Sequence, residues 1–281
     1  MKIRFYTPSY GVAGEFGAAT SGFAGSENEN ISQSLIFPVD LNGKVIYGSY
    51  DDCLQQAEKG KWNAGIVLLG NAGNENSFIR ALSEKVKVPL VGGSAAFDES
   101  NKTGRLLYGQ KEAAILLIDD DRYQYEVCCE NIHHDILSEH RITFSNARWI
   151  DKIDDCEPYR WLCEKKIKLG LAPDDFEHLT FADEHGINVH LSNLDGRLFS
   201  GRDLSEKMYL RYVPRNEVQA RMQHFYGDKN SIVFGCAGLK KILRGNLHTD
   251  GIGLFMFGEV CTVDKYSDFG NLMLSKLRIY K

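Results

Sequence analysis

The sequence predicts an α/β protein with mixed β-sheets and covering helices, arranged as two related lobes. Short runs of β-branched and aromatic residues outnumber the helical patterns along the chain. One β-α-β unit can be recognised between residues 64 and 96. In each half of the chain a predicted strand ends in a turn of small residues, Gly92-Gly93-Ser94 and Gly235-Cys236-Ala237-Gly238. We place the division near residue 150, which gives lobes of residues 1–150 and 151–281.

The first lobe contains the clearest supersecondary unit. Its first strand is an unbroken apolar run, Ala64 to Leu69, which is typical of a strand covered on both faces. Four apolar residues at helical spacing follow between residues 76 and 86, and Val88 to Val91 is the next predicted strand. We expect the two strands to be parallel neighbours joined by a right-handed crossover. A short helix from Asp51 to Lys59, capped by Asp51 or Asp52, precedes them.

Two other segments of the first lobe allow alternative interpretations. Residues 11–30 are rich in Gly, Ala and Ser, which predicts either a long surface loop or a glycine-rich loop near a ligand. Their glycines match no phosphate-binding fingerprint. Asp119 to Asp121 is predicted to be a solvated turn in a meander of antiparallel strands. A site for a hard cation is the alternative, although no further acid follows at calcium-loop spacing.

The second lobe begins with an amphipathic helix from Glu157 to Leu169, with Pro158 in its first turn. Several short strands are predicted after it. A second helix is predicted from Arg215 to Tyr226, where Asn216 can cap the start and Gly227 the end. The last predicted strand covers residues 271–279.

Two buried strands of the second lobe each end beside a chemically useful side chain. Ser231 to Phe234 leads into Cys236, and the unbroken apolar run from Gly253 to Phe257 leads into Glu259. If these strands are parallel neighbours, both side chains lie at the carboxyl edge of one sheet, where ligands bind in open α/β proteins. We expect the core of this lobe to contain Ile232, Val233, Phe234, Leu254, Phe255 and Phe257.

These strand ends resemble the C-terminal half of the FIST family, whose domains are sensory modules of signal-transduction proteins. The resemblance lies in Cys236-Ala237-Gly238 and in the Gly-aromatic-rich strand that ends in Gly258-Glu259. Gly92-Gly93-Ser94 resembles a segment of the family's N-terminal half, whereas Leu239 stands where the family has arginine. The resemblance implies a sensory protein that binds a small ligand, with amino acids the favoured class. It also implies a separate signalling partner, such as a histidine kinase.

A small zwitterion is the ligand that we expect at these residues. Backbone N–H groups of the Gly235-Cys236-Ala237-Gly238 turn suit a carboxylate, and Glu259 can accept a hydrogen bond from an ammonium group. Cys236 would supply a polarisable wall, and Gly92-Gly93-Ser94 would close the far side. Because Leu239 provides no charge, we expect weak binding. The alternative for Glu259 is a helix cap or a salt bridge with lysine or arginine.

Two further functions stay open as alternatives. Cys236 can be the nucleophile of a cysteine-dependent hydrolase or transferase, with His248, His224 or His190 as the base, or simply a small buried cysteine. Some FIST proteins are haem-dependent nitric-oxide sensors, which need an axial ligand. The candidate ligands are His133, His134, His190, His224 and His248. We expect none of them to face a large apolar cavity, so no cofactor and no metal are predicted.

Composition sets the broad class of protein. The chain has 281 residues, 43% of them hydrophobic and 25% charged, with a formal net charge of -5, which argues against a nucleic-acid or membrane-surface partner. We identify no signal peptide and no transmembrane segment. The seven cysteines lack a Cys-x-x-Cys pair, as expected for free thiols in a reducing cytoplasm.

Overall fold

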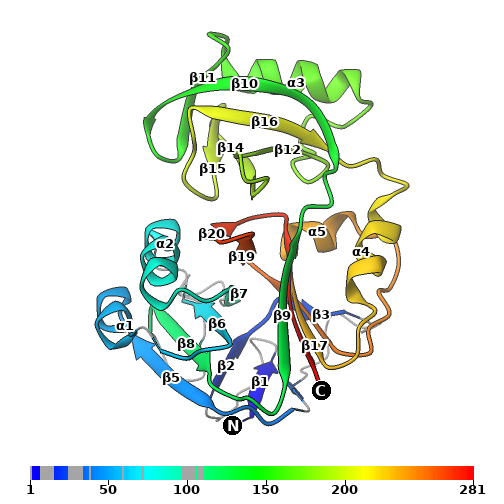
Figure 1. Cartoon of the computed structure of the whole chain (residues 1–281). Helices are drawn as coiled ribbons and strands as arrows, with labels where there is room; N and C mark the ends of the chain where they lie inside the picture. Colours follow the sequence, from blue (N-terminus) through cyan, green and yellow to red (C-terminus); the bar gives the residue numbers. More distant parts are fainter. Residues whose placement is uncertain are drawn as a thin grey trace.

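The structure is a computed structural model that describes residues 2–6, 16–24, 34–37, 39–58, 60–70, 73–96, 106 and 111–281. These residues form four sheets and five helices, so the predicted mixed α/β fold is confirmed. Figure 1 shows a small lobe, built from the strands and the helix between residues 135 and 212, above a large lobe that contains the other described elements.

The large lobe is built on a six-stranded sheet with the order β20-β19-β7-β6-β8-β5. Its strands are β5 (Gly43–Gly48), β6 (Ala64–Leu69), β7 (Leu90–Ser94), β8 (Ala113–Ile118), β19 (Glu259–Val263) and β20 (Tyr266–Gly270). As predicted, β6 and β7 are parallel neighbours, joined by α2 (Glu75–Val86). The helix α1 (Tyr50–Gln56) is capped by Ser49 and not by the predicted Asp51 or Asp52, because the Ser49 and Asp52 side chains form a capping box.

A five-stranded sheet packs against the first, in the order β3-β18-β17-β21-β9. It contains β3 (Gly22–Phe23), β9 (Gln124–Glu130), β17 (Ser231–Cys236), β18 (Ile252–Met256) and β21 (Leu274–Tyr280). β17 and β18 are neighbours, as predicted, and they run parallel. Five of the six predicted core residues are buried. Phe257 is 40% exposed, so that prediction is wrong, because β18 has already ended at Met256.

A three-stranded sheet, with the order β2-β1-β4, completes the large lobe. Its strands are β1 (Ile3–Tyr6), β2 (Phe16–Ala19) and β4 (Ser34–Ile36). The loop predicted for residues 11–30 is therefore wrong at residues 16–19, which form a fully buried strand parallel to β1. Residues 11–15 and 25–30 lie outside the described part of the chain.

The small lobe is a seven-stranded antiparallel sheet, in the order β13-β12-β16-β10-β11-β15-β14, with α3 (Pro158–Lys168) beside it. Its strands are β10 (Asp135–Asn146), β11 (Trp149–Ile153), β12 (Leu179–Ala182), β13 (Asn188–Val189), β14 (Leu191–Leu194), β15 (Arg197–Ser200) and β16 (Lys207–Tyr212). The sheets do not follow the division predicted at residue 150, which falls inside β11. β19 and β20, from the C-terminal half, complete the sheet of β5 to β8.

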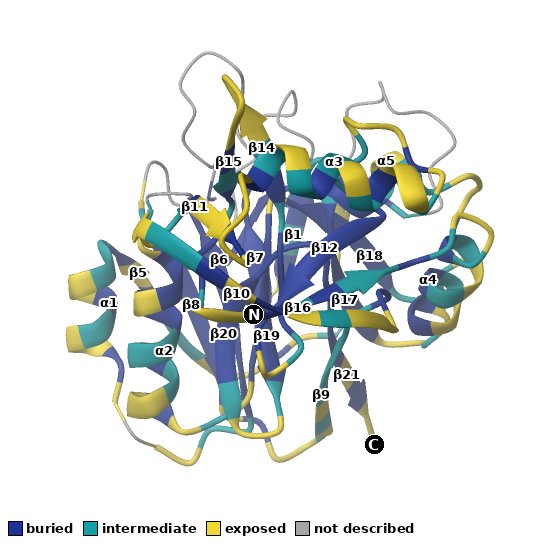
Figure 2. Ribbon diagram, turned by 90° about the horizontal axis from the view of Figure 1, so that it is seen from above, coloured by how far each residue is buried: buried dark blue, intermediate teal, exposed yellow. Residues whose placement is uncertain are grey.

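The remaining helices, α4 (Val218–Tyr226) and α5 (Ala237–Ile242), cover the outer face of the five-stranded sheet. Figure 2 shows the buried strands inside and the exposed faces of the helices outside. β19, β20 and α5 lie on the side of the large lobe that faces the small lobe (Figure 1). Among the described helices, none has the length and apolar character needed to cross a bilayer.

Candidate functional site

The chain changes sheets at Gly258, just before the predicted site residue Glu259. Gly258 has a φ of 138°, and a Cβ atom at this position would collide with the ring of Phe269. The prediction that Glu259 lies at the end of the same strand as Gly253 to Phe257 is therefore wrong. β18 ends at Met256, and Glu259 opens β19 in the other sheet.

This change of sheet brings the two predicted small-residue segments and Glu259 together. β19 runs antiparallel to β7, with Glu259 opposite Gly93 and Val260 opposite Gly92. The Ser94 N–H donates to the Gly258 carbonyl at 2.9 Å. Directly opposite residues share a face of the sheet, so Gly93 lies on the same face as the Glu259 carboxyl. The next residue, Ser94, points its hydroxyl to the other face.

Cys236 lies at the end of β17, where it is the N-cap residue of α5 and only 5% exposed. Burial and the nearby Glu259 raise the pKa of its thiol, and hydrogen bonds from the backbone N–H groups of Leu272, Gly238 and Leu239 oppose this only in part. The thiol therefore stays protonated at neutral pH. A nucleophilic cysteine needs the opposite shift.

A strained backbone segment supplies hydrogen-bond donors to both Cys236 and Glu259. Leu272 has a φ of 54°, which is unusual for a bulky residue. Its N–H points to the thiol of Cys236, and the next N–H, from Met273, donates to Glu259 Oε2 at 3.3 Å. This segment could not be predicted from the sequence, because a backbone donor leaves no mark in a residue pattern.

Glu259 is the most unusual ionisable group of the site. Its side chain is fully buried, and its Oε1 atom has no hydrogen-bond partner among the described residues. Burial raises its pKa well above the ordinary value, Cys261 adds to the shift, and the N–H groups of Met273 and Gly258 offset it only in part. Burial therefore favours the protonated form of this carboxyl.

Tyr226 provides a second buried polar group with no partner in the described part of the chain. Its ring lies behind β17, and its hydroxyl is 2.5 Å from the position of a Cβ atom on Gly235. Burial and Glu259 raise the pKa of this phenol, so it remains a neutral donor. Unpaired buried polar atoms are rare, and each one calls for an explanation.

The small lobe covers the start of α5 through Glu177. The Cγ atom of Glu177 lies 3.7 Å from the position of a Cβ atom on Gly238. One carboxylate oxygen of Glu177 is 3.0 Å from Lys241 Nζ and 3.8 Å from His190 Nε2. The predicted site therefore lies beneath the junction of the two lobes. Leu239, which replaces the arginine of the FIST pattern, is fully buried beside it.

Of the five histidines considered as haem ligands, His133 and His190 both contact Glu177, and the other three lie elsewhere. Both ring nitrogens of His133 are hydrogen-bonded within the protein, with Glu177 O at 2.8 Å on one side and Asn188 Nδ2 at 3.0 Å on the other. Burial lowers the pKa of His133 to about 4, so its ring is neutral. His134 and His248 are exposed beside acidic residues, and His224 lies on α4.

The acidic turn from Asp119 to Asp121, which was considered as an alternative cation site, lies between β8 and β9. Asp120 is buried and accepts hydrogen bonds from Arg122 Nη2 at 2.6 Å and from the Asn42 N–H at 2.9 Å. The Arg122 guanidinium holds the pKa of this carboxyl at about 2. Within the described ranges, no group of three or more His, Cys, Asp or Glu side chains is arranged to hold a metal ion.

Comparisons with families and curated proteins do not assign this chain to a family. No protein-family model matches the chain, and no curated protein is significantly similar to it. The resemblance to the FIST family therefore rests on Cys236-Ala237-Gly238, Gly258-Glu259 and Gly92-Gly93-Ser94, and it stays a prediction.

Proposed function

We propose that the protein is a small-ligand-binding sensory protein, and that an amino acid or a similar small molecule binds at the centre formed by Glu259, Cys236 and the Gly235–Gly238 turn. The buried Glu259 carboxyl, with one oxygen unpartnered among the described residues, is the observation that carries this proposal. A group of this kind is costly to bury, and perturbed carboxyls of this kind cluster at functional sites.

A ligand ammonium group would resolve the unfavourable environment of Glu259. It would donate a charge-assisted hydrogen bond to the free oxygen and favour the ionised carboxylate. Because burial favours the protonated carboxyl in the free protein and an ammonium favours the carboxylate, binding is expected to release a proton, and the affinity should rise with pH. The ligand carboxylate would compete for backbone N–H groups of the turn, because the Cys236 N–H donates to the Met273 carbonyl at 3.2 Å and the Gly238 N–H points to the Cys236 thiol.

Access to this buried centre requires movement at the lobe junction, where Glu177 covers the start of α5. A ligand that binds only after this contact opens would shift the population of lobe arrangements, which is how a sensory protein can report binding to a partner. By the FIST resemblance, we propose that this partner is a separate cytoplasmic signalling protein, such as a histidine kinase.

Calorimetric titration with the twenty amino acids tests this function. We expect weak binding of at least one of them to the wild type, and no detectable binding to Glu259→Gln, because loss of one member of a buried charge pair costs about 2–5 kcal/mol. Glu164→Gln, at an exposed ion pair on α3, is the matched control and should bind like the wild type. If no amino acid binds the wild type, or if Glu259→Gln binds equally well, the proposal is wrong.

A further inference from the structure

A cavity of about 790 Å³ lies at the other end of β19 from Glu259. One wall is a helical stripe of α2, consisting of Arg80, Ser83, Glu84 and Lys87, and the facing wall is the hairpin of β19 and β20. β19 starts at Glu259 and reaches the cavity at Thr262 and Val263, roughly 10–13 Å further along the strand. The cavity is therefore distinct from the site proposed above.

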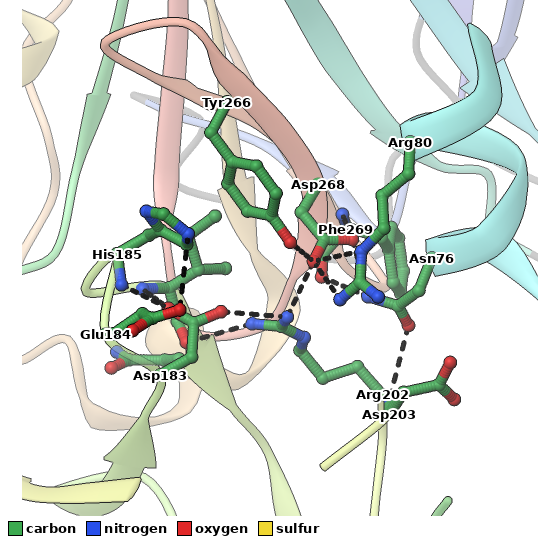
Figure 3. Close-up of polar contacts among 12 residues, drawn as sticks. Asn76, Arg80, Asp183, Glu184, His185, Arg202, Asp203, Tyr266, Asp268 and Phe269 are labelled. Atoms are coloured by element: carbon green, nitrogen blue, oxygen red, sulfur yellow. Dashed lines mark hydrogen bonds and ion pairs between the residues drawn. The ribbon is translucent and has the colours of Figure 1, made fainter. Parts of the chain in front are cut away.

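Two stacked rings from different lobes border this cavity. The ring of His185, from the small lobe, lies 4.0 Å from the ring of Tyr266, from β20, at an interplanar angle of 23°. Figure 3 shows these two rings close together, with Arg80 approaching from α2. Val88, Pro89 and Val263 add apolar surface. A flat, largely apolar ligand matches walls of this kind, and the volume suits a drug-sized molecule.

The polar side of the cavity carries a guanidinium group with spare donors. Arg80 uses Nε and Nη2 to bind Asp268 Oδ2, at 3.1 and 2.6 Å, and the guanidinium also interacts with the Tyr266 hydroxyl, which leaves some of its five N–H donors for a ligand. Two lysines, Lys87 and Lys265, also line the cavity, and so do two acids, Glu84 and Asp264. This balance favours one anionic group near Arg80 and disfavours a polyanion.

We propose that this cavity is a second ligand site, which takes a planar aromatic carboxylate. The aromatic ring packs beside Tyr266 and His185, and the carboxylate accepts a hydrogen bond from Arg80 Nη1. Because His185 belongs to the small lobe and Tyr266 to the large lobe, a bound ligand contacts both lobes. Binding to the native state alone should then raise the unfolding temperature progressively, with the logarithm of ligand concentration above the dissociation constant.

Titration with 4-hydroxybenzoate and 2-naphthoate, followed by calorimetry and by thermal unfolding, tests the site. We expect at least one of them to bind and to raise the unfolding temperature. Benzamide is flat but uncharged, and cyclohexanecarboxylate is charged but not flat, so both should bind more weakly. Ser83→Tyr fills the cavity from α2 and should weaken binding roughly tenfold or more. Ser77→Tyr, on an exposed part of the same helix outside the cavity, should leave it unchanged.

Three results would each overturn the proposal of a second ligand site. Absence of binding by both aromatic carboxylates, binding of benzamide with equal affinity, or equal binding by Ser83→Tyr and Ser77→Tyr would each do so. Glu259→Gln, at the other end of β19, should not change this affinity, so failure of one proposed site can be distinguished from failure of the other.

Discussion

Replacing Arg202 by methionine is expected to lower the free energy of unfolding by about 3–5 kcal/mol, because it leaves the buried Asp183 carboxylate without its cation and leaves Asp268 paired with Arg80 alone. Arg202 is 1% exposed. Its Nη2 atom lies 3.0 Å from Asp183 Oδ2 and 2.8 Å from Asp268 Oδ2, and its Nη1 donates to the Ile187 carbonyl at 3.0 Å. Asp183 and Arg202 belong to the small lobe and Asp268 to β20, so this network joins the lobes (Figure 3).

Urea unfolding of matched variants measures this effect. Arg160→Met removes an 82% exposed arginine that pairs with Glu164, and it should cost no more than about 1 kcal/mol. Adding Asp183→Asn to Arg202→Met removes the stranded charge, so the double variant should lose less than the sum of the two single losses. A loss for Arg202→Met no greater than that for Arg160→Met would contradict the role of the network.

The stability of the wild type should fall with rising pH relative to that of Glu259→Gln. The pKa of Glu259 is raised in the folded protein, so the folded state holds this proton more tightly than the unfolded chain does. The free energy of unfolding therefore falls as the pH rises from the ordinary pKa of glutamate to the pKa of Glu259 in the folded protein. One proton held by the folded state and not by the unfolded chain changes the free energy of unfolding by about 1.4 kcal/mol per pH unit. Glutamine cannot ionise, so the difference between the two curves should grow with this slope above about pH 5.

Urea unfolding at pH 5, 6, 7 and 8 provides the two curves. Burial of His133 lowers its pKa to about 4, which gives a stability change of the opposite sign, but this change is common to both proteins and cancels in their difference. Glu164→Gln, at an exposed position, serves as the control and should follow the wild type. Parallel curves for the wild type and Glu259→Gln would show that the buried carboxyl does not retain its proton.

The sequence alone was sufficient to predict those strands and helices whose residue patterns are local. The apolar runs of β6 and β7 and the helical spacing of α2 predicted a parallel strand pair, and the structure confirms it. The apolar runs of β17 and β18 predicted adjacent strands, and these are neighbours as well. Binary patterns report burial along one segment, and each of these four strands is buried along its length. The capping of α1 by Ser49 was missed because Asp51 and Asp52 offer the same signal a few residues later.

The candidate site was predicted only in part, because its geometry depends on long-range contacts. Cys236, Gly93 and Glu259 do come together, but through a change of sheet at Gly258 that an unbroken apolar run concealed. Leu272 and Met273 contribute backbone N–H groups, which no residue pattern reveals. Likewise, the pairing of Arg202 with Asp268 joins charges 66 residues apart, which no local spacing could predict.

Native mass spectrometry of the protein purified from its own host tests most directly whether Glu259 is the centre of a small-ligand site. We predict a population that is heavier than the chain by one small organic molecule, and that is absent from Glu259→Gln purified in the same way. The bare chain alone in both preparations, the same adduct on both, or an adduct with the mass of haem would contradict this account.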